Sequence, residues 1–525
     1  MTECEAFIRD TVEQLKPLAK AYNLADWEAA ISSSPQAIRQ SEITQAALMA
    51  FWADPDRLAV ARRLNNTPAA DPLTARQIRL IYLNAARNQQ DGATIQALAQ
   101  IEAQVRSRYY NFRGTVGGRR LSDNELDDLL GQSRDSRQVQ DVWEASKQVG
   151  EQVADQVREL ARVRNLAARR QGYRDHFHRA LTLDEIDEAW LLDMFARLEA
   201  ATDAPFAALK AEIDAARARH FGLPASALRP WHYGDRFFQD PPAMGALDLD
   251  SLFAGKDPVQ LALATYDGLG LDVRAIVARS DLYPRESKNQ HAFSTDIDRE
   301  GDVRTLNNLQ PNHRWTETLL HELGHAVYSS HHDPALPWLL RDSPHTTSTE
   351  AVALLMGSLT YDGEWLEQVA GLPASEAAQF VAAARERERA MRLIFARWCL
   401  VMTHFERGLY ADPDGDLNTL WWNLVEKYQH LTRPEGRHAP DWAAKIHMAL
   451  VPVYYHNYAL GHLQVAQLQA CLRGRFGGLA GRRAAGQWLV EKFFRPGAQQ
   501  DWLAHLQTAT GEPLQLRHFA DALKA

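Results

Sequence analysis

Hydrophobic residues recur every three or four positions over most of this chain, which is the pattern of amphipathic α-helices. Two long stretches show this pattern without interruption, residues 137–170 and residues 376–410. Clusters of proline, glycine and aspartate interrupt it, and turns are expected there. These clusters lie at residues 65–72, 221–230, 238–245 and 411–416. The pattern predicts a mostly helical protein in which the apolar stripes form the core.

A β-strand pattern is convincing in only one place. NQHAFSTDI (289–297) and DVRTLNNL (302–309) flank the polar turn DREGD, which is typical of a β-hairpin. The hairpin comes directly before a further helical pattern at residues 313–328. We therefore predict a helical body with one small sheet at its centre.

Composition narrows the choice of partners. The 525 residues are 46% hydrophobic and 24% charged, as in ordinary globular proteins. A net charge of −9 without any basic block argues against a nucleic-acid partner. The three cysteines (Cys4, Cys399 and Cys471) lack the spacing of a disulfide framework, which favours a reducing compartment. No apolar run approaches the roughly 18 residues of a membrane span, and the N-terminal residues do not resemble a signal peptide. We therefore expect a cytoplasmic protein with no membrane partner.

The helical pattern at residues 313–328 contains the motif His321-Glu322-Leu323-Gly324-His325. Two histidines four positions apart lie on one helix face, so both imidazoles can reach the same metal ion. Glu322 lies about 100° around the helix from His321. It can therefore contact a metal-bound water without being a ligand, as a general base must. Ordinary helices with two exposed histidines also contain this short motif, so a third ligand is needed to support a metal site.

Glu350 is the candidate third ligand. It lies near the start of a second helical pattern, residues 348–359, beside an apolar run. A carboxylate in such surroundings needs a partner, which a zinc ion would provide. Two histidines and one carboxylate with an open fourth position are typical of catalytic zinc. The other interpretation of Glu350 is a first-turn glutamate favoured by the helix dipole.

The segment that carries these motifs resembles the angiotensin-converting-enzyme family of dipeptidyl carboxypeptidases and, more distantly, the thimet-type oligopeptidases. In both families a glutamate follows the HExxH motif after some two dozen residues, as Glu350 does here. The loop DPALPWLLRDSPHTTSTEA (333–351) is similar to the family's loop before the glutamate helix. The resemblance implies a mostly α, two-lobed ellipsoidal metallopeptidase with a deep central cleft and a small β-hairpin next to the zinc helix. It divides the single catalytic domain (1–525) into an N-terminal helical lid (1–120), the hairpin (289–309) and the zinc-binding helices (313–360).

The resemblance also implies a set of substrate-binding residues. His291 and Ala292 match a His-Ala pair on the strand that cradles the substrate. Lys445 matches the family's lysine and would hold the substrate's C-terminal carboxylate, together with Tyr455 or Tyr454. The residues alone also permit Lys445 as a solvated helix lysine and Tyr454 as a core residue.

His447 and Tyr458 match residues that donate hydrogen bonds to the developing oxyanion. Three positions depart from the family pattern. Leu354 replaces an aspartate that orients a zinc histidine. Asn457 replaces an arginine tied to chloride binding, so chloride activation is not expected. Tyr233 aligns with a glutamine that helps hold the carboxylate.

These residues predict zinc-dependent hydrolysis of short peptides, with Glu322 activating a Zn²⁺-bound water. The first hypothesis is a dipeptidyl carboxypeptidase that releases dipeptides from free C-termini. A thimet-like endo-oligopeptidase, which needs no free carboxylate, is the alternative, and Lys445 distinguishes the two. A catalytically inactive scaffold on the peptidase fold is a further alternative, although the intact triad and base argue against it.

Overall fold

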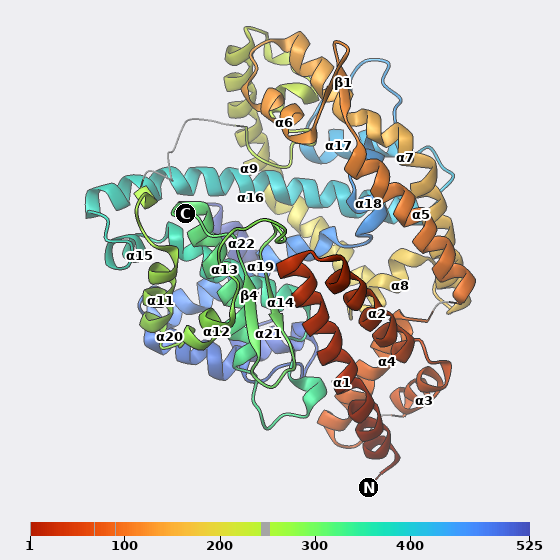
Figure 1. Cartoon of the computed structure of the whole chain (residues 1–525). Coiled ribbons are helices and arrows are strands. Elements are labelled where there is room, and N and C mark those ends of the chain that lie inside the picture. Colours follow the sequence, from red (N-terminus) through yellow and green to blue (C-terminus); the bar gives the residue numbers. More distant parts are fainter. Residues whose placement is uncertain (1, 68, 90, 243–251, 525) are drawn as a thin grey trace. The chain divides into compact units, whose positions relative to one another are not determined.

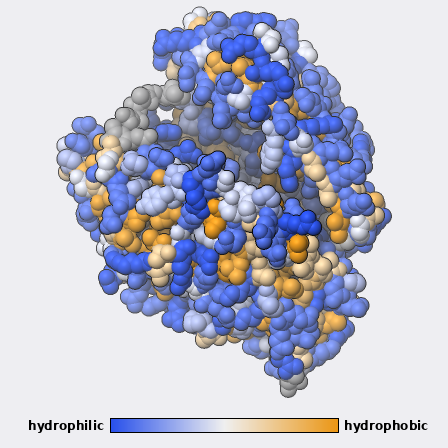
Figure 2. All heavy atoms as spheres, in the orientation of Figure 1, coloured by the Kyte–Doolittle hydropathy of each residue, from blue (hydrophilic) through white to orange (hydrophobic). Residues whose placement is uncertain are grey.

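A computed structural model describes residues 2–67, 69–89, 91–242 and 252–524 (Figure 1). It confirms the mostly helical fold. The two long amphipathic patterns are the helices α7 (Ser136–Arg170) and α16 (Ala374–Ala411). Val139, Val142 and Val153 of α7 are fully buried, as the spacing predicts. On the face shown in Figure 2 hydrophilic residues predominate, and apolar residues occur in scattered groups. Within the described ranges, none of the helices combines the length and apolar character needed to cross a bilayer.

The chain divides into two compact units, and each is made of several separate segments. The first unit comprises residues 1–89, 247–384 and 460–519, and the second comprises residues 90–246, 385–459 and 520–525. The predicted lid region, residues 1–120, is therefore divided between them after residue 89. Of the helices in the described ranges, three contribute to both units: α16, α19 (Tyr455–Phe476) and α22 (Leu516–Ala522).

The first unit contains the predicted hairpin and the helices around it. Its elements are α1 (Glu3–Ser32), α2 (Pro35–Trp52), α3 (Pro55–Asn66), α4 (Pro72–Arg87), α11 (Pro258–Leu269), α12 (Arg274–Arg279), β3 (Phe293–Asp296), β4 (Val303–Leu306), α13 (His313–Ser330), η3 (Trp338–Leu340), α14 (Thr346–Gly357), η4 (Ser358–Tyr361), α15 (Gly363–Gln368), α20 (Arg483–Leu489), η6 (Val490–Phe494) and α21 (Trp502–Thr510).

The second unit is built mainly from long helices. Its elements are α5 (Gly92–Asn111), β1 (Gly114–Val116), β2 (Arg119–Leu121), α6 (Asp123–Gln132), α7, α8 (His176–Leu183), α9 (Glu188–Phe221), η1 (Ala225–Ala227), η2 (Pro230–Tyr233), α17 (Leu417–Gln429), η5 (Asp441–Ala444) and α18 (His447–Leu450).

The predicted hairpin is present as the antiparallel pair β3–β4, in which Phe293 pairs with Leu306 and Asp296 with Val303. The helix α1 covers it. Trp27 of α1 packs into a buried cluster with Ile297 and Leu306, and the Asn23 amide donates to the backbone carbonyls of Asp296 and Ile297, each at 3.1 Å. These contacts fix the strand pair that forms one wall of the site described below.

The second hairpin, β1–β2, was not expected from the sequence. Gly117 and Gly118 join its strands, and both have positive φ angles, 56° and 82°. Two glycines between short extended segments are typical of a two-residue hairpin turn, so the sequence did contain a signal for it.

The helices α13 and α14 pack closely against each other because glycine and alanine meet where they cross. A β-carbon at Gly324 would lie only 2.8 Å from Cα of Ala353. The glycine inside the HExxH motif therefore lets the glutamate helix approach the histidine helix. Leu319, Leu320 and Leu323 of α13 are fully buried and hold this helix in the core.

Candidate active site

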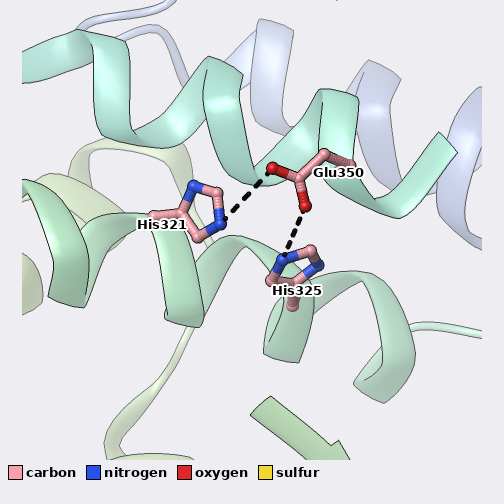
Figure 3. A group of neighbouring side chains, drawn as sticks. All are labelled: His321, His325 and Glu350. Atoms are coloured by element: carbon pink, nitrogen blue, oxygen red, sulfur yellow. Dashed lines mark ion pairs between the residues drawn. The ribbon is translucent and has the colours of Figure 1, made fainter. Parts of the chain in front are cut away.

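The three predicted metal ligands meet between α13 and α14 (Figure 3). Nε2 of His321 lies 3.8 Å from Oε1 of Glu350, and Nε2 of His325 lies 3.5 Å from Oε2 of the same carboxylate. One candidate ligand atom from each residue lies within 4.8 Å of the other two. Tetrahedral zinc with bonds of about 2.0–2.1 Å separates its ligand atoms by roughly 3.4 Å. The donor set and its spacing therefore fit a zinc ion.

The triad is partly open to the solvent. The side chains of His321, His325 and Glu350 are 24%, 20% and 35% exposed. They line a cavity of about 560 Å³, together with Glu322 and residues of the β3 strand. Three protein ligands beside an accessible cavity leave a position for water or substrate, which distinguishes a catalytic site from a structural one.

Burial and nearby charges shift the pKa values of His321 and Glu350. Burial lowers the pKa of His321 to about 4, which leaves its imidazole neutral and able to bind a metal. For Glu350, burial alone would raise the pKa, but the nearby His325, His321 and His462 lower it overall. A neutral imidazole beside a carboxylate is the state that a divalent cation requires.

Glu322 differs from Glu350 in its surroundings. It is 7% exposed, and burial raises its pKa to about 7, with His325 and Glu350 acting in opposite directions. It lines the same cavity as the triad without being part of the ligand cluster. A carboxylate held this way suits proton transfer near neutral pH.

Thr349 contacts the triad and was not expected from the sequence. Its Oγ1 lies 2.8 Å from Nδ1 of His325. The family position for a carboxylate that orients a zinc histidine is Leu354, which cannot accept a hydrogen bond. The structure therefore shows a hydroxyl beside His325 one residue before Glu350, whereas the family pattern has its carboxylate four residues after the glutamate.

The predicted substrate strand contributes only in part to the metal cavity. Ala292 lines this cavity, together with Phe293 and Ser294. His291 lines a neighbouring cavity of about 710 Å³ beside residues of α1, and its side chain is exposed. Of the His-Ala pair, therefore, only Ala292 lies along the metal cavity.

The remaining predicted residues belong to the second unit. Nζ of Lys445 donates to Oε1 of Gln239 at 2.7 Å and lies 5.9 Å from the ring centre of Tyr455. Phe237 and Trp398 place their rings 5.3 and 5.6 Å from the same nitrogen. Burial lowers the pKa of Lys445 to about 8, although Asp235 and Asp240 oppose this effect. Lys445 is therefore not a solvated helix lysine.

Tyr233, which aligns with the family's glutamine, contacts residues other than Lys445. The Tyr233 hydroxyl donates to Asp214 at 2.7 Å and accepts from Lys210 at 2.8 Å, so it belongs to a separate buried ion-pair network. Gln239, six residues later, contacts Lys445 instead. The segment after η2 is irregular, so its course cannot be deduced from local residue patterns.

Aromatic rings surround His447. The ring centre of His447 lies 4.9 Å from that of Tyr455, and the Tyr455 ring lies 5.3 Å from Tyr458. Tyr454 packs against Tyr458 at 5.1 Å. Burial and the nearby Lys445 lower the pKa of His447 to about 4, so its ring is neutral at pH 7. The sequence motif therefore corresponds to one continuous cluster around Lys445 and His447.

A mostly helical fold that carries HExxH on one helix and a glutamate ligand on the next defines the class of zinc metallopeptidases with a two-histidine, one-glutamate site. Two family models match the chain: peptidase family M3 over residues 277–525 and angiotensin-converting enzyme over residues 1–187. The chain is thus similar to peptidase family M3 in its C-terminal part and to angiotensin-converting enzyme in its N-terminal part, and both similarities support a metallopeptidase.

Carboxypeptidase 1 of Bacillus subtilis (strain 168) is similar to this chain, with 27% identity over 273 residues. The match covers 46% of this chain and 53% of the relative. The chain thus spans about half the length of the curated relative that it matches.

Proposed function

We propose that this protein is a zinc-dependent dipeptidyl carboxypeptidase that removes dipeptides from the free C-termini of short peptides. His321, His325 and Glu350 would hold the zinc ion, as their spacing and protonation support. When bound, zinc polarises the scissile carbonyl and increases the acidity of water. Matches to the angiotensin-converting-enzyme and M3 models support peptide hydrolysis as the reaction.

Glu322 is the proton-transfer group in this proposal. Its carboxylate takes a proton from the attacking water and later passes it to the leaving amine. Because burial raises its pKa to about 7, the carboxyl can hold and release this proton near neutral pH. Glu322 lines the cavity that holds the triad, so the proton has no long path to travel.

His447 and Tyr458 are the proposed oxyanion donors. The ring of His447 is neutral, and within the described chain its Nδ1 has no hydrogen-bond partner. A neutral imidazole can donate one hydrogen bond without bringing a full charge. Donors of this kind contribute about 3–4 kcal/mol to the transition state in well-studied hydrolases. Directly before β3, Ala292 offers backbone groups along which a peptide can lie as an added strand, with His291 preceding it.

The environment of Lys445 is the observation that favours removal from a free C-terminus. Among the described residues no carboxylate oxygen lies within 4.0 Å of its Nζ, although the amine is held by Gln239 and three aromatic rings. A half-buried cation without a carboxylate partner is a site for the carboxylate of a ligand. Tyr455 lies beside this amine, which favours it over Tyr454 for the accompanying role. The name of the Bacillus relative, a carboxypeptidase, agrees with this mode.

The test compares a short peptide with a free C-terminus and the same peptide as its C-terminal amide, each incubated with the zinc-loaded protein and followed by mass spectrometry. Serial loss of two residues from the acid alone is expected. Loss of single residues would show a carboxypeptidase that removes one amino acid at a time. Equal internal cleavage of both peptides would favour the endo-oligopeptidase, and no cleavage of either would favour an inactive scaffold.

Two variants make this test specific. Lys445→Met keeps the length of the side chain and removes its charge, so KM for the acid should rise roughly 10- to 100-fold, as expected for a lost charge-assisted bond of 1.5–3 kcal/mol. Lys492→Met, at an exposed lysine of the same chain, is the matched control. Glu322→Gln should abolish cleavage of the free acid while retaining zinc. An unchanged KM in Lys445→Met would exclude this residue as the carboxylate anchor.

A further inference from the structure

Nδ1 of His325 lies within hydrogen-bonding distance of the Thr349 hydroxyl, and a metal on Nε2 of the same ring would decide the direction of this bond. Nε2 of this ring lies 3.5 Å from Glu350, on the side where the candidate ligand atoms converge. A metal can bind Nε2 only through its lone pair, so the proton must then be on Nδ1. Nδ1–H consequently donates to Oγ1 of Thr349, 2.8 Å away.

The two histidines of the triad are not supported equally. Within the part of the chain that the structure describes, no side chain accepts a hydrogen bond from Nδ1 of His321. Position 354, which offers a carboxylate in the related family, is Leu354 here. Of the two histidines, therefore, only His325 has a side-chain partner on its Nδ1 among the described residues, and this partner is Thr349.

We propose that Thr349 is a positioning residue for the metal centre, whose hydroxyl fixes the ring angle of His325 and accepts from its Nδ1–H when Nε2 binds the metal. This inference rests on the proposed metal role of His321, His325 and Glu350. The hydroxyl takes the place of the carboxylate that usually supports a zinc histidine.

The local structure explains how Thr349 can do this. It is the fourth residue of α14 and directly precedes Glu350, so one turn of helix provides both a ligand and the support of another ligand. The start of this turn is fixed by His345, whose Nδ1 accepts from the backbone N–H of Thr347 at 3.1 Å. The close approach of Gly324 to Ala353 holds α14 against α13. Thr349 also lines the same cavity as His325 and Glu350, so its hydrogen bond to His325 lies beside the candidate metal site.

A neutral acceptor has a consequence that a carboxylate would not have. A carboxylate that accepts the Nδ1 hydrogen bond makes a zinc-bound histidine a more basic ligand. A neutral hydroxyl in the same place raises the basicity of the histidine less. Orientation is therefore the main contribution of Thr349. Loss of such a supporting contact lowers metal affinity by about 10- to 100-fold in known zinc sites.

The test measures the zinc dissociation constant by competition with a chromophoric chelator, independently of catalysis. Thr349→Val retains the shape of the side chain and removes the acceptor, and should weaken zinc binding about 10- to 100-fold. Thr349→Ser restores the hydroxyl and should bind within about threefold of the unsubstituted protein. Thr346→Val, at an exposed threonine of the same helix turn, is the control and should leave the affinity unchanged.

Several results would overturn the inference. Equal zinc affinity in Thr349→Val and the unsubstituted protein would exclude a positioning role, as would a failure of Thr349→Ser to restore binding. Should Thr349→Val fold poorly by circular dichroism, Thr349→Ala provides the same comparison. Failure of the unsubstituted protein to bind zinc would instead contradict the proposed function itself, so the two failures are distinguishable.

Discussion

His332 is a buried histidine outside the metal centre that should make the stability of this protein depend on pH. Burial lowers its pKa to about 4. The neighbouring Asp342 opposes this effect, while Arg299, His505 and His331 add to it. Neither of its ring nitrogens has a hydrogen-bond partner in the described chain. In the unfolded chain a histidine has a pKa near 6.5, so between pH 6.5 and 4 the unfolded state binds a proton that the folded state does not.

The free energy of unfolding should therefore fall as the pH is lowered through this window. The contribution of one such proton is a slope of about 1.4 kcal/mol per pH unit. We expect His332→Phe, which keeps a ring beside Tyr328, to remove this part of the slope in urea unfolding of the metal-free protein. Comparison of the two proteins at pH 8, where His332 is neutral in both states, isolates the effect on packing. Parallel slopes between pH 4 and 6.5 would contradict the prediction.

The residues of the site differ in how far the sequence could predict them. His321, Glu322 and His325 follow from spacing along a single helix, because helix geometry alone brings them to one place. Glu350 could be predicted because it lies near the start of the next helical pattern in the sequence. Thr349 and Gln239 could not be predicted, since each depends on a contact between elements, and the family pattern indicated Leu354 and Tyr233 instead. A short-range sequence pattern predicts which side chains share one face of a helix. It does not predict which residues of another element pack against that face.

Packing between α13 and α14 can be tested through the glycine within the motif. A β-carbon at Gly324 would lie 2.8 Å from Cα of Ala353 and 3.2 Å from Cγ of Met356, so Gly324→Ala must push the helices apart. We expect destabilisation of about 1–3 kcal/mol, partly offset by the higher helix propensity of alanine. Because the movement separates Glu350 from the histidines, zinc affinity should fall as well.

Gly474, in the helix α19, is the matched control, because a β-carbon there meets no atom within 4 Å. Gly474→Ala should leave zinc affinity unchanged and stabilise the protein by up to about 1 kcal/mol. The measurements are denaturant unfolding and zinc titration of both variants. Unchanged zinc binding in Gly324→Ala would show that the contact between the helices does not set the ligand spacing.

At the scale of elements, the sequence predicted long helices well and short strands unevenly. The helices α7 and α16 differ from their predicted ranges by no more than two residues at either end, because 35 and 38 residues give many repeats of the hydrophobic pattern. The strands β3 and β4 are shorter than predicted, with four residues each. The pair β1–β2, with three residues in each strand, offers almost no periodicity and was missed, although its Gly117-Gly118 turn was visible.

The division into two units lies beyond what the sequence pattern could predict. Each unit is assembled from three segments, and the boundaries at residues 384/385 and 459/460 fall inside the helices α16 and α19. The charged run at residues 385–389 and Gly461 lie next to these boundaries, but both are inside continuous helices and so do not mark a break in the chain. The lid proposed for residues 1–120 remains a prediction. The boundary between the two units near residue 89 is a suitable site for the truncation that would test it.

The shared helices predict how the whole molecule responds to loss of zinc. The candidate metal ligands all lie in the first unit, so zinc should stabilise that unit directly, by about 4 kcal/mol at a free concentration a thousand times the dissociation constant. Yet α16 and α19 each have one part in each unit. Because helix formation is cooperative, loss of packing at one part of such a helix also destabilises the other part. We therefore expect calorimetry to show one transition with or without chelator, at a lower temperature when zinc is absent. Hydrogen exchange of α7 in the second unit should increase together with that of α13 as the chelated protein is warmed. A separate early transition that exposes α13 while α7 stays protected would show instead that the units unfold independently.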